Sequence, residues 1–427
     1  MAVVLASAPA RETPRAETTT VSTPARTPVR LDELLAYADG RAPLVARARS
    51  QVSFGAAEIT AARPLVIANP TIGTAVGARM NRMGTAFEVQ ITASQQLEIA
   101  GERRMRLHAA GAYDVSVRRK LDQSRFETRI HVRAQFALAV LARERAEMAT
   151  AIRDFTATTV RHTQAQVDAG EISPLRARMA EVALAQATQN RREAERAYRA
   201  ACRDLATQAG WPVDVPLEPI GELRAPMPAG SAQAYVDDVL ADHPELAALD
   251  AALDSARARA RAERREAWPE PTLGGYVARE HPPGTPFADF VALATISVPL
   301  PLWRRNQGDR ARADAAVRVA ETDLAMRRYE LTQRVHRMVD AVDTSAQRVE
   351  GYARDVLPRF QENLDLLQRA FELGEIDIVG VSVGRQAFLD AQRSALDTWE
   401  DYITALREVE LALGRDLGWS PGGPTRG

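Results

Sequence analysis

Cysteine, lysine and long apolar runs are all scarce in this chain of 427 residues. Cys202 is the single cysteine, so the chain forms neither an internal disulfide nor a zinc site of several thiolates. Lys120 is the single lysine, and no P-loop of the form G-x-x-x-x-G-K-[ST] is present. No segment approaches about 18 consecutive apolar residues, which excludes a membrane-spanning helix. If the chain crosses a membrane, it must therefore use strands.

The charges of the chain are almost balanced, with 55 basic and 56 acidic side chains and a formal net charge of −1. This balance gives no electrostatic reason to expect nucleic acid as a partner. The sequence also lacks a G-x-S-x-G nucleophile elbow and a glycine-rich dinucleotide fingerprint after a strand. Glu127 and His131 stand one helical turn apart, but this spacing is more typical of a surface pair than of a metal site. We therefore expect no enzyme, no cofactor and no resident metal.

Residues 1–30 are expected to form a disordered tail. The segment from Met1 to Ala8 is a short apolar run that ends in Ala6-Ser7-Ala8, which resembles the end of a signal peptide without its basic start. The following residues to Val29 are rich in Pro, Thr, Arg and Ala and have no apolar period. Two explanations stay open, a start codon placed too far downstream or a plain disordered start, and sequencing the mature N-terminus separates them.

An internal duplication organises the rest of the chain. Three landmarks recur in the same order roughly 200 residues later. The pairs are Asn69–Gly73 with Glu270–Gly274, Gly170-Glu171-Ile172 with Gly374-Glu375-Ile376, and Ala209-Gly210-Trp211 with Leu417-Gly418-Trp419. We therefore divide the chain into a first repeat (31–211), a proline-rich linker (212–232), a second repeat (233–419) and a tail (420–427).

Each repeat is expected to contain a helix, a β-hairpin, a long helix, a tight tip turn and a returning helix. The hairpins are expected at 71–97 and 272–298, and the tip turns at 169–173 and 373–377. Phe87, Val89, Ile91 and Ala93 alternate with polar residues, as in a strand with one apolar face. The long helix of the second repeat is expected over Gln307–Phe371, with a bend near Pro358.

Heptad spacing predicts that the long and returning helices pack together as an antiparallel hairpin. Two rows lie on the long helix: Leu324, Leu331 and Met338, and Val335, Val342, Val349 and Val356. Two rows lie on the returning helix: Leu389, Leu396 and Ile403, and Trp399, Leu406 and Leu413. The predicted fold class is mainly α with a small β part. Four strands leave two open edges, and single-chain outer-membrane barrels begin at about eight strands, so a closed barrel requires several chains.

The junction that follows the second hairpin, Ile296-Ser-Val-Pro-Leu-Pro-Leu-Trp-Arg-Arg-Asn-Gln-Gly308, resembles the strand-to-helix junction of the TolC-like outer membrane efflux proteins. The Leu357-Pro358 step and the paired Gly-Glu-Ile turns also resemble this family, and the junction is most similar to the branch that serves heavy-metal efflux. The resemblance implies a homotrimer that forms a 12-stranded transmembrane β-barrel in the outer membrane lipid, above a coiled-coil tunnel in the periplasm. It also implies a periplasmic adaptor protein and an inner-membrane pump, often of the resistance-nodulation-division class, as partners.

The same resemblance assigns roles to the tip turns. It implies that Gly170, Glu171, Ile172, Gly374, Glu375 and Ile376 meet the adaptor, and the alternative is that they are ordinary turns. Glycine suits such turns because it tolerates a positive φ. The family often carries an acidic residue several positions after the second turn, but Ile378–Val383 contains none. Glu375 and Asp377 are therefore our candidates for an acidic ring at the tunnel entrance.

The predicted function is that of a passive outer-membrane channel in a tripartite efflux system, with metal cations favoured as cargo and drugs as another option. Two alternatives stay open, a soluble coiled-coil scaffold and the outer-membrane duct of a type I protein secretion system. The hairpins favour a duct, because a scaffold gives no reason for two hairpins roughly 200 residues apart.

Overall fold

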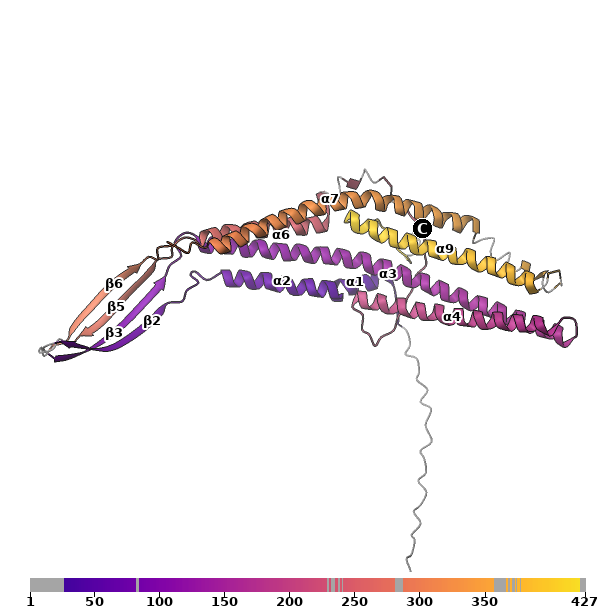
Figure 1. The fold of residues 1–427 in the computed structure, drawn as a ribbon, viewed down its shortest axis with the longest axis horizontal. Helices are drawn as coiled ribbons and strands as arrows, with labels where there is room; N and C mark the ends of the chain where they lie inside the picture. The colour runs from indigo at the N-terminus through magenta and orange to yellow at the C-terminus, as the bar shows by residue number, and fades with distance from the viewer. Residues whose placement is uncertain are drawn as a thin grey trace, which may run out of the picture.

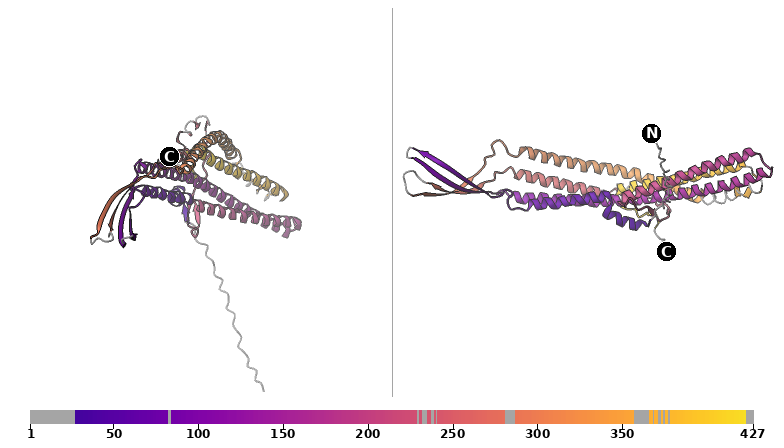
Figure 2. Two further views of the ribbon diagram at one scale, coloured as in Figure 1. Left: turned by 60° about the vertical axis from the view of Figure 1, so that its left-hand side comes forward. Right: turned by 90° about the horizontal axis from the view of Figure 1, so that it is seen from below.

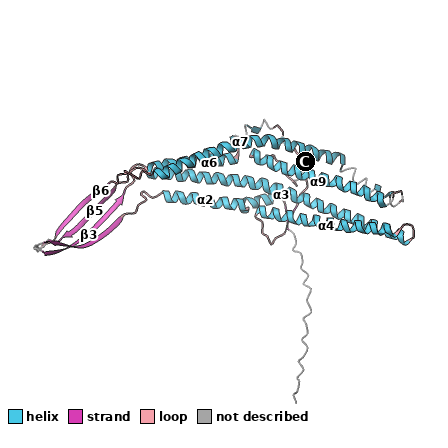
Figure 3. Ribbon diagram, viewed as in Figure 1, coloured by secondary structure: helices cyan, strands magenta, loops and turns pink. Residues whose placement is uncertain are grey.

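The structure is a computed structural model, and it describes residues 27–81, 84–228, 230–231, 235–236, 239, 241–280, 287–356, 366–367, 369–370, 373, 375–376 and 378–422. The molecule is long and narrow, with a small β-sheet at one end and helices along the rest of its length (Figure 1). Figure 2 shows from two further sides that the strands extend beyond the ends of the helices. The predicted fold class, mainly α with a small β part, is confirmed (Figure 3).

Both repeats have the same order of elements. The first contains α1 (Leu31–Arg41), α2 (Pro43–Ala62), β2 (Thr71–Asn81), β3 (Gly84–Gln96), α3 (Glu102–Asp168) and α4 (Pro174–Ala209). The second contains α6 (Pro244–Arg265), β5 (Thr272–Glu280), β6 (Asp289–Ser297), α7 (Gln307–Gly351) and α9 (Ile378–Leu413). The ranges 71–97 and 272–298, which we assigned to hairpins, contain these four strands.

In each repeat two shorter helices lie one after the other along one long helix. Helix α3 has 67 residues, which is about 100 Å at ~1.5 Å per residue. It contacts α2 near the sheet and α4 toward the other end, and α7 contacts α6 and α9 in the same way (Figure 1). Contacts between α3 and α6 and between α3 and α9 join the two repeats into one body.

The predicted heptad rows form the core of the second repeat. Leu331, Val335 and Val342 of α7 are buried against Ile403 and Leu406 of α9 in one hydrophobic cluster. Regular spacing of apolar residues on both helices therefore produces a continuous packed seam. The antiparallel hairpin of helices expected from the sequence is present in this part of the chain.

The long helix of the second repeat does not stay a regular α-helix over the whole range that the sequence predicted. Helix α7 ends at Gly351, and Tyr352–Val356 forms a π-helix. Pro358 stands two residues after Val356 in the sequence, and a proline has no backbone N–H to donate to the carbonyl four residues before it, which favours a local change of hydrogen bonding. The bend that we expected at Pro358 itself lies outside the described residues.

Caps fix where α4 and α6 begin. Pro174 and Pro244 occupy the first turns of α4 and α6, where a missing backbone N–H costs nothing. Ser173 Oγ accepts a hydrogen bond from the backbone N–H of Leu175 at 3.3 Å. His243 Nδ1 accepts from the N–H of Glu245 at 3.1 Å, and its Nε2 lies 3.1 Å from the carbonyl of Leu411. His243 thereby ties the start of α6 to the end of α9.

A short parallel sheet corrects one boundary of the sequence analysis. Strands β1 (Thr27–Val29) and β4 (Leu217–Pro219) pair, and the N–H of Ile220 donates to the carbonyl of Val29 at 3.0 Å. Val29 is only 3% exposed and packs with Leu217 in the core of the first repeat. The tail that we drew through residue 30 is therefore ordered from Thr27, because a single apolar side chain reaches this core.

Strands β2, β3, β5 and β6 form one antiparallel sheet in that order. Each hairpin pairs its own strands, and β3 pairs with β5 to join the two repeats. Strands β2 and β6 lie at the two edges. Among the described helices, none contains an 18-residue stretch that is apolar enough to cross a membrane.

Candidate functional site

One face of the four-stranded sheet is apolar and exposed. The register places Val76 opposite Val89, and Ile91 opposite both Thr74 and Val277. Ile72 is 78% exposed and Phe290 is 74% exposed, although both side chains are fully apolar. The apolar positions of this face are Ile72, Val76, Ala78, Met80, Phe87, Val89, Ile91, Ala93, Leu273, Val277, Phe290, Ala292, Ala294 and Ile296. An exposed apolar surface of this extent marks a face that contacts lipid or another protein.

The opposite face of the sheet carries mostly small and polar residues. Thr92 lies opposite Gly73 and Tyr276, and its hydroxyl donates to the carbonyl of Gly73 at 3.2 Å. Farther from the helices, Glu88, Glu280 and Asp289 follow one another in register across three strands. The two faces therefore differ as the lipid and lumen faces of a membrane barrel strand differ.

The turn between α3 and α4 closes by a Schellman motif. The N–H of Gly170 donates to the carbonyl of Val167, and the N–H of Glu171 donates to the carbonyl of Gln166, both at 2.9 Å. Gly170 has a φ of 74°, which is the left-handed conformation that this motif requires and that glycine adopts without strain. Glu171 and Ile172 then lead into Ser173, which caps α4.

The turn before α9 repeats one of these two hydrogen bonds. The N–H of Glu375 donates to the carbonyl of Ala370 at 2.8 Å, with the same spacing as the bond between Glu171 and Gln166. Glu171 and Glu375 are both exposed, and Ile172 and Ile376 are both half-buried. Gly374 and Asp377, the other residues predicted for this turn and for the acidic ring, lie outside the described residues. Figure 1 shows the start of α9 and the turn before α4 at the end of the molecule opposite to the sheet.

The helices that leave the two tip turns begin with exposed apolar side chains. On α4 these are Leu175 and Met179, and on α9 they are Val379 and Val383. Both pairs are spaced by four residues, so each pair lies on one side of its helix. The two pairs stand at matching positions after the two turns, which makes a repeated apolar surface next to the tips.

A buried ionic network that the sequence analysis did not identify links the repeats. Arg133 of α3 donates a hydrogen bond to Glu410 of α9 and forms an ion pair with Asp416 beyond it. Burial raises the pKa of Glu410 to about 7 despite the charge of Arg133. Partial burial alone would raise the pKa of Asp416. The hydrogen bond and the charge of Arg133 outweigh this effect, so the pKa of Asp416 is lowered. The signal was present in the sequence, because the row Leu389, Leu396 and Ile403 continues after seven residues to Glu410.

The weak metal motif of the sequence analysis lies at a small cavity between the repeats. Glu127, His131 and His243 are among its lining residues, and Glu127 accepts a hydrogen bond from Gln123 Nε2 at 2.6 Å. Burial and the charge of Arg407 lower the pKa of His131. In the part of the chain that the structure describes, no three His, Cys, Asp or Glu side chains are grouped so that they could hold a metal ion.

Comparisons with known proteins agree with this architecture. Residues 235–415 match the family model described as outer membrane efflux protein. The chain is 26% identical over 396 residues to the cobalt-zinc-cadmium resistance protein CzcC of Cupriavidus metallidurans, covering 91% of this chain and 90% of that protein.

Two solved outer membrane channels share the fold. The CmeC channel of Campylobacter jejuni superimposes with a TM-score of 0.72 at 12% identity, over 90% of this chain and 85% of that chain. The MtrE channel of Neisseria gonorrhoeae, solved in an open state, superimposes with a TM-score of 0.67 at 18% identity, over 90% of this chain and 89% of that chain. The resemblance inferred from the sequence is thereby confirmed, and the part of the chain that matches the model of the outer membrane efflux proteins lies in its second repeat.

Proposed function

We propose that this protein is the outer-membrane channel of a tripartite efflux system, through which heavy-metal cations leave the cell. The observation that carries the proposal is the sheet with an exposed apolar face and a small, polar opposite face, placed at the end of a long helical body. A soluble scaffold would expose this apolar face to water, which is unfavourable in free energy, and would gain nothing from it. Outer membrane efflux activity and an outer-membrane location are also properties of the matching family.

The channel that we propose is a homotrimer. Strands β2 and β6 are the edges of the four-stranded sheet, and unpaired edge groups are not tolerated in lipid. Three copies that pair β6 of one chain with β2 of the next leave no open edge. Together they have twelve strands, an even number within the range of bacterial barrels. The helices of the three copies then form a tunnel in the periplasm that continues the lumen.

In this proposal the tip turns meet a periplasmic adaptor protein, which connects the tunnel to an inner-membrane pump of the resistance-nodulation-division class or a similar type. The exposed apolar pairs next to the turns, Leu175 with Met179 and Val379 with Val383, support this, because exposed apolar side chains gathered at one end mark a protein contact. Glu375 contributes to an acidic ring at the entrance together with Asp377. The channel itself performs no reaction, and the pump supplies the free energy of transport.

Docking at the tip is tested by Leu175→Glu combined with Val379→Glu. We expect this variant to assemble in the outer membrane but to lose co-purification with its adaptor, because two charges replace apolar contact area at the matching positions. Val213→Glu is the matched control, since Val213 is fully exposed in the linker, away from the tips. Equal recovery of the adaptor with both variants would refute tip docking.

The cargo is tested in a Gram-negative host from which the outer-membrane channel of its own metal efflux system is deleted. Because the curated relative is a cobalt-zinc-cadmium resistance protein, we expect expression of this chain to restore growth on these three metals more strongly than on a panel of drugs. Restored drug tolerance without metal tolerance would contradict the proposal that the cargo is metal cations. It would still agree with the proposal that the protein is an efflux channel.

A further inference from the structure

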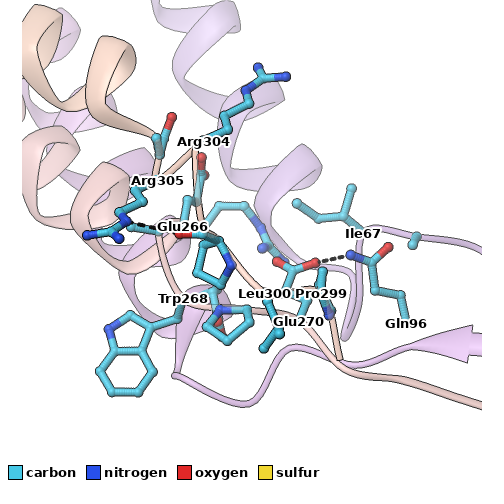
Figure 4. Close-up of a pocket in the computed structure, with 16 residues that line it drawn as sticks. Ile67, Gln96, Glu266, Trp268, Glu270, Pro299, Leu300, Arg304 and Arg305 are labelled. Atoms are coloured by element: carbon cyan, nitrogen blue, oxygen red, sulfur yellow. Dashed lines mark hydrogen bonds between the residues drawn. The ribbon is translucent and has the colours of Figure 1, made fainter. Parts of the chain in front are cut away.

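A cavity of about 570 Å³ lies where the sheet meets the helices. Its wall combines segments of both repeats, and Figure 4 labels Ile67 and Gln96 from the first and Glu266 and Glu270 from the second. Glu102 of the first repeat and the segments Pro299–Pro301 and Arg304–Asn306 of the second also line it. None of its sixteen lining residues is a cysteine or a histidine. The cavity is separate from the apolar face of the sheet and from the tip turns.

Five glutamates gather in and around this cavity, and arginine neutralises two of them. Glu98 accepts hydrogen bonds from Arg106 at 2.9 Å and from the N–H of Ile67 at 3.1 Å. Glu263 forms an ion pair with Arg259 at 2.7 Å. The other three, Glu102, Glu266 and Glu270, form no ion pair with any residue in the described part of the chain.

The cationic side chains on the cavity wall do not balance the remaining charge. Arg106 is already engaged with Glu98 and with the carbonyl of Pro64 at 3.2 Å. Arg305 Nε donates to the carbonyl of Pro301 at 2.9 Å, and Arg304, the other arginine of the wall, forms no ion pair within the described ranges. Among the described residues, the wall therefore carries two arginines without ion pairs, Arg304 and Arg305, against three carboxylates without ion pairs, which leaves an excess of one negative charge.

Glu102 is the most unusual of these carboxylates because it is only 3% exposed. Its Oε2 accepts a hydrogen bond from the N–H of Ala100 at 2.9 Å, but its buried Oε1 has no partner in the described residues. A buried carboxylate oxygen without a partner is strongly unfavourable, so a cation beside it would stabilise it. Arg106 Nε on the same wall is also buried without an acceptor in the described residues.

The environment of the other two glutamates is consistent with a missing positive charge. Burial raises the pKa of Glu270, and the nearby charges of Glu102 and Glu98 raise it further. Glu270 keeps one neutral partner, Gln96 Nε2, which donates to its Oε2 at 2.5 Å (Figure 4). Burial and the charge of Glu263 raise the pKa of Glu266 in the same way.

We propose that this cavity binds a hard divalent cation, Ca²⁺ or Mg²⁺, through Glu102 and Glu270. The donors are oxygen atoms only, which is the ligand set that these ions prefer over softer transition metals. Because no three acidic side chains in the described structure converge on one point, the ion keeps part of its water shell, and the cavity volume leaves room for those waters. The ion joins Glu102 of the first repeat to Glu270 of the second at the base of the sheet.

The test uses Tb³⁺, a luminescent ion that occupies Ca²⁺ sites, on the purified full chain in detergent. Trp268 lines the cavity and is 56% exposed, so light absorbed by its indole sensitises a Tb³⁺ ion bound beside it. We expect tryptophan-sensitised luminescence that Ca²⁺ or Mg²⁺ displaces and Na⁺ at equal ionic strength does not. Whichever of the two divalent ions displaces it at lower concentration is the preferred occupant.

Variants assign the signal to the cavity. Trp268→Phe is expected to abolish the luminescence, whereas Trp303→Phe leaves it, because Trp303 does not line the cavity. Glu270→Gln and Glu102→Gln are expected to weaken Tb³⁺ binding several-fold, and Glu193→Gln, an exposed carboxylate of α4, removes the same charge without effect. Glu270 is half-buried, so its variant remains informative if Glu102→Gln does not fold.

Unchanged Tb³⁺ binding in Glu270→Gln, or luminescence that survives Trp268→Phe, would overturn the proposal. A complete lack of sensitised luminescence in the unmodified chain would overturn it as well. The experiment needs no pump or adaptor, so a negative result would not contradict the proposed efflux function. In the same way, a loss of efflux activity would not contradict the proposed cation site.

Discussion

At the scale of single residues, the structure shows how a heptad row continues into an ion pair. Leu396 and Ile403 are followed at the next heptad position by Glu410, which is 1% exposed and accepts a hydrogen bond from Arg133. A carboxylate at a core position requires a buried partner, because an isolated buried charge is strongly unfavourable. Arg133 supplies that partner from the other repeat, so one position in the seam of the second repeat also fixes α9 against α3.

The first prediction concerns the pH dependence of stability. Because the pKa of Glu410 is raised to about 7 in the folded protein from 4.5, its protonation stabilises the fold. This contribution is complete below the unfolded pKa, where it amounts to about 3 kcal/mol, and it is lost as the pH rises through about 7. We expect thermal unfolding in detergent to occur at a lower temperature at about pH 8.5 than at about pH 6.

Glu410→Gln isolates this effect, because glutamine stays neutral at both pH values. Burial lowers the pKa values of His131 and His243, and these groups destabilise the fold as the pH falls below their unfolded pKa, which acts in the opposite direction. Both histidines remain in the variant, so its difference from the unmodified chain reports on Glu410. An identical pH dependence in the two proteins would show that Glu410 does not titrate in this range.

The second prediction concerns the conformation of the first tip turn. Gly170→Ala places a side chain at a φ of 74° and is expected to destabilise the protein by about 1 kcal/mol. Gly111→Ala is the matched control, because Gly111 lies within α3 with open space around an added Cβ, and alanine there is expected to stabilise by up to ~1 kcal/mol. Thermal unfolding of both variants checks this, and shifts of the same sign would contradict the assigned turn geometry.

At the scale of elements, the sheet combines two hairpins whose faces differ in polarity. The pairing of β3 with β5 places Ile91 beside Val277 on the apolar face, and Gln90 beside Ala278 on the opposite face. Neighbouring residues of one strand therefore face different surroundings. Substitutions at two adjacent residues can therefore test which face of the sheet contacts lipid.

The third prediction uses this alternation. Ile91→Arg is expected to reduce the amount of protein in the outer membrane, because an arginine on the lipid face of a barrel strand costs about 2–4 kcal/mol near the bilayer midplane. Gln90→Arg introduces the same charge on the other face and is expected to assemble normally. Fractionation of the outer membrane checks both variants. Equal amounts of the two variants would contradict a lipid contact at Ile91.

The elements that the sequence predicted are those whose signal is local. Alternation from Phe87 to Ala93 identified β3, and heptads identified the seam between α7 and α9. Strand β1 was not predicted, because its pairing with β4 depends on residues about 190 positions away and on a single buried valine. The junction cavity was not predicted either, since it brings Glu102 next to Glu270 only after β3 and β5 have paired.

At the scale of the whole molecule, the chain is elongated, and its four-stranded sheet has two edges, β2 and β6. The long helices give the helical body a length on the order of 100 Å, and the sheet lies at the end opposite to the tip turns. Duplication gives both repeats a hairpin at one end and a tip turn at the other, so each repeat spans the full length. The internal repeat could therefore be read from the sequence, while the closure of the sheet edges follows only from an assembly of several copies.

If copies of this chain close into a membrane channel, the assembled oligomer conducts ions. The most direct measurement is the single-channel conductance of the purified oligomer in a planar bilayer, after expression with a signal peptide in a Gram-negative host and extraction of the outer membrane. We predict steady pores from a trimer, with a preference for cations that decreases when the acidic ring is removed by Glu375→Ala and Asp377→Ala. A protein that stays out of the membrane fraction and conducts no current would contradict the account and favour a soluble scaffold.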